Sequence, residues 1–343
     1  MNFQNDRYTL KFADSSDNVG IREIFESSTF SGGISVQYLR NPRPYESFLA
    51  DGDEAKILVV IDNEMKKAIA VGGAVVRREY LNGQEEKCAY LTGLKIHPDY
   101  RKTLSFLTKS YDFLHEEISD CRCCYTTILD DNLPAIAMFE KKRKNMPEYR
   151  YLGHYTTYCF HGGRKLLDIE KDHFDGFDKL MKTHFAAQNL VPVDCHYQGF
   201  GEQTFYCARE GGEIIACCFV GNQQGYKQYK MNSYGGIYKA LSKLPTRLFG
   251  YPEFPKADTI VNHGVISYLY IRDCDEKLCR RFLRTVAAQA DFSLLIWGGF
   301  ENNPLCAALD RMRTVYYGSR LYSVLWDDRP APSGVIGVEV ALL

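Results

Sequence analysis

The chain of 343 residues is 45% hydrophobic and 25% charged, an ordinary globular composition, and its length favours two domains over one. Its 42 Lys and Arg residues nearly balance 43 Asp and Glu residues, which gives a formal net charge of −1. The overall charge therefore gives no reason to expect nucleic acid or an anionic membrane as a partner.

The opening residues, MNFQNDRYTLKF, are too polar for the apolar core of a signal peptide, and no apolar run approaches the roughly 20 residues of a membrane-spanning helix. We therefore expect a cytoplasmic protein whose twelve cysteines are reduced. Cys121, Cys123 and Cys124 lie close together but lack a second ligand pair at zinc spacing, so no metal site is predicted.

Short apolar alternations and turn residues organise the first part of the chain. Two prolines make residues 39–45 loop-like, and Asn82-Gly83 is a strong signal for a tight hairpin turn. Around these turns we predict a strand over residues 8–12, a helix over 19–26, and two antiparallel strands over 56–62 and 68–81.

The next stretch, residues 90–114, reads YLTGLKIHPDYRKTLSFLTKSYDFL and organises the rest of the chain. An apolar strand over residues 90–96 ends at His97-Pro98, because Pro98 disfavours a helical conformation in the residue before it. A basic turn follows, and then a helix whose unpaired N–H groups and positive dipole end face the tip of the strand, a suitable place for an anion. One face of that helix is marked by apolar residues at intervals of three and four, namely Leu104, Leu107, Tyr111, Leu114 and Ile118.

A strand, a capped helix and an aromatic strand complete the first half. Residues 124–129 are predicted as the strand, and Asn132 followed by Pro134 is the expected opening of the helix. An aromatic-rich strand over residues 149–160 leads to the glycines of HGGRK. We place the domain boundary there, between residues 161 and 162.

The second half repeats this order at a spacing of about 170 residues, as expected of a duplicated unit. We predict a helix over residues 166–188, a hairpin that turns at Gly211-Gly212, an insertion over 224–255 without clear period, and VISYLYIRD as the counterpart of YLTGLKIHP. The tail, VIGVEVALL, is predicted as a terminal strand. The turn after VISYLYIRD is acidic and would repel an anion at the start of the following helix, so we expect no anion site in the second half.

Two segments, YLTGLKIHPDYR and DDNLPAIAMFEK, resemble the signature segments of the GNAT superfamily of acetyltransferases. In that family, a loop between a strand and a helix cradles the pyrophosphate of acetyl-CoA. Pro98, Tyr100 and Arg101 match the family's loop pattern, whereas Leu104 and Ser105-Phe106 stand where the family has glycines. The resemblance covers almost the whole chain and implies an α/β (α+β) fold of two tandem GNAT-like domains, each a mixed, mostly antiparallel, splayed sheet flanked by helices.

The resemblance implies that residues 1–161 hold an acyl-CoA site, with acetyl-CoA as co-substrate and no metal, and that residues 162–343 are a degenerate, non-catalytic copy. Arg101 and Lys102 are the strongest functional candidates, because basic residues at a helix start oppose the dipole but suit a bound polyphosphate. Ordinary surface charge explains them as well. The residues expected to contact the cofactor are Leu94, Lys95, Ile96, Arg101, Lys102, Thr103, Leu104, Ser105 and Asn132.

Transfer of an acyl group to an amine needs a base, an oxyanion donor and an acid for the departing thiolate. The family's base position falls at Tyr90, which is either the catalytic residue or a half-buried aromatic of the strand, and its usual acid position falls at Phe139, which has no proton to give. Gly93 marks either a bulge that supplies the oxyanion donor or a site of close packing. Three carboxylates lie close enough to supply a base through water but are expected on a solvated hairpin face, namely Glu79, Glu85 and Glu86.

These residues are compatible with three functions. The first is an N-acyltransferase that uses its first half to move an acetyl group from acetyl-CoA to a small-molecule or peptide amine. The second is a catalytically silent GNAT-like protein that binds a ligand or a partner. The third is an aminoacyl or peptidyl transferase resembling the Fem-type enzymes, which use a charged tRNA, and the neutral overall charge argues against it.

Overall fold

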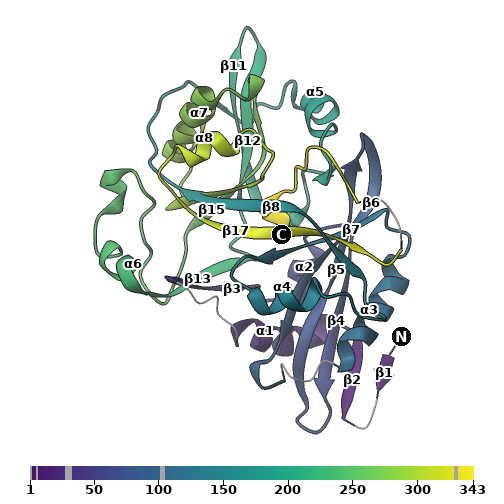
Figure 1. The fold of residues 1–343 in the computed structure, drawn as a ribbon. Coiled ribbons are helices and arrows are strands. Elements are labelled where there is room, and N and C mark those ends of the chain that lie inside the picture. Colours follow the sequence, from purple (N-terminus) through teal and green to yellow (C-terminus); the bar gives the residue numbers. More distant parts are fainter. Residues whose placement is uncertain (1, 5–6, 28–32, 101–104, 328–330) are drawn as a thin grey trace.

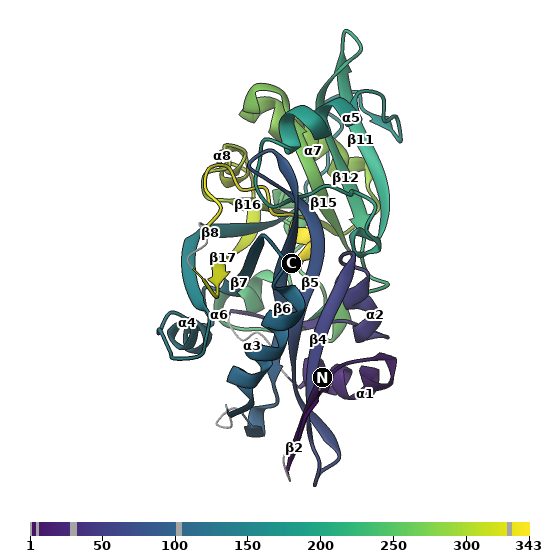
Figure 2. The ribbon, with the colours of Figure 1, turned by 90° about the vertical axis from the view of Figure 1, so that its right-hand side faces the viewer.

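One long mixed sheet runs through the whole molecule and carries helices on its faces (Figure 1, Figure 2). The predicted α/β class, with a mostly antiparallel sheet flanked by helices, is confirmed. The chain ends in the interior, near the middle of the sheet (Figure 1). This computed structural model describes residues 2–4, 7–27, 33–100, 105–327 and 331–343.

The first half contributes antiparallel hairpins followed by one parallel step. Its strands in this sheet are β1 (Asn2–Gln4), β2 (Tyr8–Phe12), β4 (Glu54–Asp62), β5 (Lys67–Leu81), β6 (Gln84–Ile96), β7 (Cys123–Leu129) and β8 (Glu148–Phe160). Sheet neighbours from β1 to β6 pair antiparallel, and β7 lies parallel to β6. Asn82 and Gly83, with φ values of +52° and +77°, make the hairpin turn predicted between β5 and β6.

The second half contributes strands in a similar order. Its strands in this sheet are β9 (Glu170–Lys171), β10 (Val191–Pro192), β11 (Glu202–Glu210), β12 (Glu213–Asn222), β15 (His263–Ile271), β16 (Leu294–Phe300) and β17 (Thr314–Leu325). β11, β12 and β15 pair antiparallel in sequence, and β16 lies parallel to β15. The one parallel step in each half therefore falls at equivalent places in the two repeats.

The two halves exchange strands. β17, from the end of the second half, lies between β7 and β8 of the first half, and β8 in turn lies between β17 and β16. All twelve residues of β17 have partners on β8, and Ser319 to Ser323 also pair with β7. The predicted boundary after residue 161 falls just beyond β8, so it divides the sequence without dividing the sheet.

Helices cover both faces of the sheet. They are α1 (Asn18–Glu26), α2 (Pro44–Leu49), α3 (Ser105–Ile118), α4 (Leu133–Phe139), α5 (Phe177–Leu180), α6 (Gly236–Leu241), α7 (Glu276–Gln289) and α8 (Cys306–Asp310). α3 and α4 pack in one core on one face of the first half, and α1 and α2 pack in another core on the opposite face. α7 and α8 share a core in the second half. None of these helices, within the described part of the chain, is long and apolar enough to cross a membrane.

A small second sheet bridges the two halves. It pairs β3 (Ile34–Leu39) with β13 (Gln228–Tyr234), and β13 with β14 (Thr259–Ile260). The loop predicted over residues 39–45 is confirmed for the residues between the end of β3 and the start of α2. The insertion over 224–255 holds β13 and α6, which its irregular sequence did not indicate.

The helix predicted over residues 166–188 is wrong. This stretch holds α5 and a π-helical turn over Met181–Phe185, after the short strand β9. Asp172 has a φ of +55° and Gly176 a φ of +86°, and neither conformation fits a right-handed helix. The apolar period of the sequence therefore cannot continue as one helix.

The terminal strand predicted over residues 335–343 is also wrong. Ile336 makes an isolated bridge with Asn189, and residues 340–342 form a short 3₁₀ turn. Ile336 and Val338 are buried in a core together with side chains of β6, β7 and β8. The apolar pattern of the tail thus reflects filling of the interior between strands of both halves.

Candidate functional site

In the first half, the parallel strands β6 and β7 separate after a short paired region. Pairing runs over three residues of each strand and reaches Tyr90 on β6 and Tyr125 on β7. Both strands continue beyond these residues, and there the Thr126 hydroxyl donates a 2.7 Å hydrogen bond to the carbonyl oxygen of Leu91. The splay predicted for this sheet is therefore present between β6 and β7.

A β-bulge lies on the β6 side of this gap. Between Val71 and Gly73 the register of β5 against β6 shifts, so that β6 carries one extra residue at Gly93. Gly93 has a φ of +70°, and a Cβ atom built there would lie 2.7 Å from Cζ of Phe48. Gly93 therefore marks a bulge and also a close approach, and its role as the oxyanion donor stays a prediction.

Tyr90 lies at the root of the gap. Its hydroxyl is 2.7 Å from the Thr127 hydroxyl, and its ring centroid is 5.2 Å from that of Tyr125. Burial raises the pKa of Tyr90, although the bond to Thr127 and the positive charge of Arg77 oppose this. A phenol with a raised pKa stays protonated at neutral pH, so Tyr90 can donate a proton there but is unsuited to be the base.

Lys95 lies two residues beyond the bulge on the same strand. Its ammonium nitrogen is 4.6 Å from the ring centroid of Phe25, a ring that also lies within 4 Å of the Cβ position built on Gly93. Burial, assisted by the positive charge of Arg40, lowers the pKa of Lys95 to about 8. The structure thus places an amine that titrates near neutral pH next to the bulge, on the face of the sheet that α1 and α2 cover.

The other predicted cofactor residues are distributed as follows. Leu94 is exposed and Ile96 packs against the core that contains α3. Asn132 caps α4, where its side-chain oxygen accepts a 3.4 Å hydrogen bond from the Ala135 amide. Ser105 is the first residue of α3. Arg101, Lys102, Thr103 and Leu104 lie outside the described residues, and their role stays a prediction.

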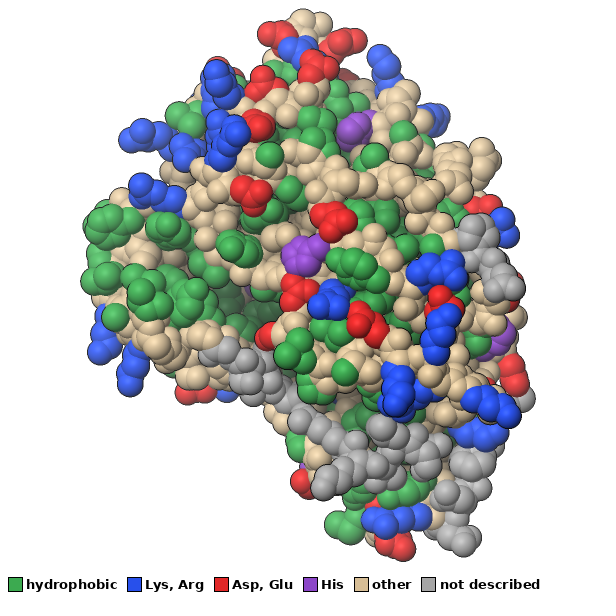
Figure 3. Space-filling view, viewed as in Figure 1, with side chains coloured by type: hydrophobic (Ala, Val, Ile, Leu, Met, Phe, Trp, Pro, Cys, Tyr) green, Lys and Arg blue, Asp and Glu red, His purple; other side chains and the backbone are tan. Residues whose placement is uncertain are grey.

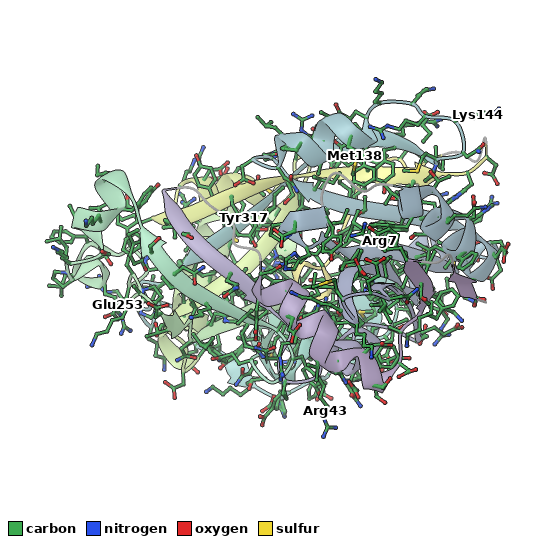
Figure 4. All side chains as sticks on the ribbon, turned by 90° about the horizontal axis from the view of Figure 1, so that it is seen from below. Arg7, Arg43, Met138, Lys144, Glu253 and Tyr317 are labelled. Carbon is green, nitrogen blue, oxygen red and sulfur yellow. The ribbon has the colours of Figure 1, made fainter. Side chains whose placement is uncertain are left out.

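Tyrosines from three strands lie close to one another. The ring centroids of Tyr38 on β3 and Tyr229 on β13 are 5.5 Å apart. Burial, together with the neighbouring Tyr317 hydroxyl and a hydrogen bond to it, raises the pKa of Tyr229. Tyr317 on β17 points between the two sheets (Figure 4). Burial raises the pKa of Tyr317, while hydrogen bonds with Thr157 and Tyr229 oppose this, and 38% of the residue stays exposed.

A buried charged network lies next to Tyr125, and the sequence analysis did not predict it. Arg77 donates to a carboxylate oxygen of Glu79 at 2.7 Å and to the Tyr125 hydroxyl at 2.9 Å, and that hydroxyl donates to Glu79 at 2.6 Å. The prediction that Glu79 lies on a solvated hairpin face is wrong, because its side chain is fully buried. Arg77 and Glu79 are two residues apart on one strand, so their side chains point to the same face of the sheet. That spacing was the sequence signal that could have predicted their contact.

A second buried ion cluster joins the two halves beneath the same face. Asp51 contacts Arg40 of the first half at 2.9 Å and Lys227 of the second half at 2.8 Å. Arg77 also donates to the backbone oxygen of Asp51 at 3.1 Å, which links this cluster to the network around Glu79. These residues are nearly inaccessible to solvent, so each charge depends on its partners.

The second half contains an equivalent gap and an equivalent bulge. Parallel pairing of β15 with β16 covers three residues of each strand and ends at Val265 and Ile296. The register of β12 against β15 then shifts, and Tyr268 takes a φ of +50° where the first half has Gly93. The Tyr268 amide donates a 2.8 Å hydrogen bond to a carboxylate oxygen of Glu339. The bulge amide of the second half is thus occupied by the protein's own tail.

The α4 face carries a further polar group that the sequence did not indicate. His154 on β8 lies 2.6 Å from a carboxylate oxygen of Asp130, which follows β7, and Thr156 approaches its other ring nitrogen at 3.3 Å. Strand β17 lies between β7 and β8, so the two side chains meet across it. Among the described residues, no group of three or more His, Cys, Asp and Glu side chains is arranged to hold a metal ion.

Comparison with solved structures shows that the chain has the GNAT fold. It matches Saccharomyces cerevisiae N-myristoyltransferase with bound myristoyl-CoA at a TM-score of 0.61 and 10% identity, over 98% of this chain and 90% of that chain. It matches a GCN5-related N-acetyltransferase from Anabaena variabilis at 0.52 and 11%, over 92% and 72%, and one from Kribbella flavida at 0.51 and 12%, over 93% and 71%. No family model and no curated protein sequence matches the chain. The predicted resemblance is confirmed at the level of fold.

Replacement of Gly93 tests the bulge. In Gly93→Ala, the positive φ costs about 1–2 kcal/mol, and overpacking against Phe48 adds about 1–3 kcal/mol. Gly83→Ala is the matched control, because Gly83 has a φ of +77° but no heavy atom within 4 Å of its Cβ position. We expect urea unfolding to show a larger loss of stability for Gly93→Ala. Equal losses in the two variants would contradict the close approach.

Replacement of Glu339 tests the closed bulge of the second half. Burial raises the pKa of Glu339 from 4.5 to about 8, so the folded state keeps a proton that the unfolded state has lost. The stability from this group is therefore complete below pH 4.5 and is lost as pH rises towards 8. Glu339→Gln keeps an oxygen for the Tyr268 amide and removes this titration.

We expect the unfolding free energy of the unmodified protein, relative to Glu339→Gln, to fall between pH 5 and pH 8 by at most about 1.4 kcal/mol per pH unit. Urea unfolding at three pH values measures this difference. Parallel pH profiles of the two proteins would show that Glu339 is not buried in the way described.

Proposed function

We propose that the protein is an acyl-CoA-dependent N-acyltransferase whose reaction takes place in the gap between β6 and β7. The observation that carries the proposal is the bulge at Gly93, which lies at a point where two parallel strands separate and close to an amine with a lowered pKa. The GNAT fold supports the proposal, because a solved neighbour with this fold holds myristoyl-CoA. Acetyl-CoA is the donor that the sequence favours, and a longer acyl-CoA is the alternative.

In this reaction the nitrogen of an acceptor amine forms a bond to the thioester carbonyl carbon, and the bond from that carbon to sulfur breaks. The amine loses a proton, and the CoA thiolate gains one. We assign the base to Lys95, because a group that titrates near the working pH transfers protons most efficiently. We assign the acid to Tyr90, whose phenol keeps its proton at neutral pH.

The acyl-CoA phosphates would lie at the start of α3. The first turn of a helix offers unpaired N–H groups and the positive end of the dipole, both of which favour an anion. Arg101, Lys102 and Thr103 are adjacent to that turn in sequence. We propose that they contact the pyrophosphate, and that Asn132 at the start of α4 borders the cofactor arm.

The acceptor would reach the gap from the face that α1 and α2 cover. Tyr38, Tyr229 and Tyr317 lie close together there, and Figure 3 shows the surface hollowed beside the part of the molecule at its left that carries α6 in Figure 1. Hydroxyl groups on an aromatic wall suit a small-molecule or peptide amine. We keep a cytoplasmic location as a prediction.

One observation favours the catalytically silent alternative. Phe139, at the position of the family's usual acid, is buried in the core and stacks on Tyr149 with ring centroids 4.5 Å apart. This position is therefore part of the packing and has no proton to give. If Tyr90 does not take over the acid's task, the protein binds a ligand without turning it over.

Titration with acyl-CoA separates these two functions. Acetyl-CoA, myristoyl-CoA and CoA are added to the full chain, and thermal unfolding is followed. A ligand at about 100 times its dissociation constant stabilises the folded state by roughly 2.7 kcal/mol. We expect a shift with at least one acyl-CoA, together with release of free CoA when small amines and peptides are supplied. A shift without CoA release supports the silent alternative. The absence of any shift contradicts acyl transfer and leaves a silent protein that binds another ligand or a partner.

Lys95→Arg tests the assigned base. Arginine stays charged at all working pH values, so the variant keeps a cation but cannot accept a proton. We expect acyl-CoA affinity close to that of the unmodified protein, CoA release about 100-fold slower, and loss of the rise in rate near pH 8. Lys179→Arg, at an exposed site on α5, is the control. An unchanged rate of CoA release in Lys95→Arg would contradict the assignment of Lys95 as the base and leave it as a predicted cofactor contact.

Tyr90→Phe tests the assigned acid. The variant keeps the ring that packs against Tyr125 and removes the hydroxyl next to Thr127. We expect CoA release to slow by about 100-fold while acyl-CoA affinity stays within about twofold. A rate equal to that of the unmodified protein would remove Tyr90 from the reaction and leave it as a strand aromatic.

A further inference from the structure

The segment after β13 carries an unusual concentration of exposed apolar side chains. Single exposed apolar residues are normal on a protein surface, but clusters of them mark interaction sites. α6 begins this segment, and none of its residues is buried. The large apolar side chains, with their exposed fractions, are Leu248 (82%), Ile237 (70%), Phe249 (56%), Leu244 (51%) and Tyr251 (41%).

The same segment is basic, although the chain as a whole is not. Residues 236–256 hold four exposed Lys and Arg residues and one acidic residue, Glu253, which gives 4 − 1 = +3. The formal charge of the whole chain is −1, so the remaining residues together carry −4. The near-neutral overall charge, which gave no reason to expect a membrane, is thus the sum of a positive segment and a negative remainder. The basic residues are Lys239, Lys243, Arg247 and Lys256.

The exposed side chains belong to a folded lobe. The Thr246 hydroxyl donates to the Pro252 oxygen at 2.7 Å, and the Tyr234 hydroxyl donates to the Pro255 oxygen at 2.7 Å. The ring of Phe254 packs inward against Tyr234, with centroids 5.5 Å apart. One set of apolar residues thus holds the lobe together while another set points outward.

The lobe projects from one side of the molecule. In Figure 1 it extends furthest to the left, beyond the sheets. Figure 3 shows hydrophobic side chains gathered over this lobe, with basic side chains along its edges. A convex apolar surface with a basic rim suits a soft, flat, negatively charged partner better than it suits the groove of a folded protein.

We propose that residues 236–256 dock the protein on the surface of an anionic lipid bilayer. The apolar side chains enter the boundary between headgroups and acyl chains, and the lysines stay at the level of the lipid phosphates. The apolar stretch does not cross the bilayer, so docking is reversible and depends on salt. This proposal is independent of the proposed acyl transfer.

Sedimentation with lipid vesicles tests the proposal on the full chain. Vesicles of phosphatidylcholine alone are compared with vesicles that contain 30% phosphatidylserine, a composition chosen to be roughly as anionic as a cytoplasmic leaflet. We expect binding to the anionic vesicles, at least tenfold weaker binding to the neutral ones, and loss of binding as salt rises from about 0.1 M to about 0.5 M. Equal binding to both kinds of vesicle, or binding to neither, would overturn the proposal. Binding to neither would indicate a protein partner for the lobe instead.

Variants locate the contact. Leu248→Ser and Lys243→Glu are each expected to weaken binding to anionic vesicles about fivefold or more, with unchanged thermal unfolding because both side chains are exposed. Met65→Ser, at a position that is 66% exposed on the opposite half, is the matched control and should bind as the unmodified protein does. An equal loss in Met65→Ser, or no loss in Leu248→Ser, would contradict docking through this lobe.

Discussion

The pairing of β17 with both β7 and β8 is the constraint on which the rest of the structure depends. Pairing along all twelve residues of β17 joins strands of both halves in one sheet. The exchange covers the far edge of β7, so the opening beside β7 lies on its β6 side. It also places Tyr317 of the second half on the strand next to β7 of the first half. The acyl-transfer site we propose is therefore a product of both repeats.

The duplicated bulge shows how one architecture gives an open and a closed site. Gly93 and Tyr268 occupy equivalent register shifts, and both take positive φ values. A non-glycine residue with this backbone conformation is strained, and Tyr268 is held there by burial and by the bond from its amide to Glu339. The bulge amide of the second half is bonded to the tail, and the prediction that the second half is non-catalytic stays a prediction.

Sequence patterns correctly predicted turns, caps and helices that depend on neighbouring residues. They did not predict contacts between residues that are distant in the sequence. The turn at Asn82-Gly83, the cap at Asn132 and the helix after the basic turn follow from preferences within a few residues, and all are present. The burial of Glu79 was missed because its partners, Arg77 and Tyr125, meet across neighbouring strands. The strand exchange and the pairing of His154 with Asp130 require contacts that no single stretch of sequence encodes. The mostly antiparallel α/β fold was predictable from the sequence, whereas the composition of the site was not.

Hydrogen exchange measured with and without a bound acyl-CoA tests the central claim most directly, because protection reports where a ligand orders the backbone. The two repeats serve as internal controls for each other. We predict slower exchange in β6 beyond the bulge and at the start of α4, with unchanged exchange in β15 and β16. Protection confined to the second half, or saturating acyl-CoA without protection beside Gly93, would contradict the account.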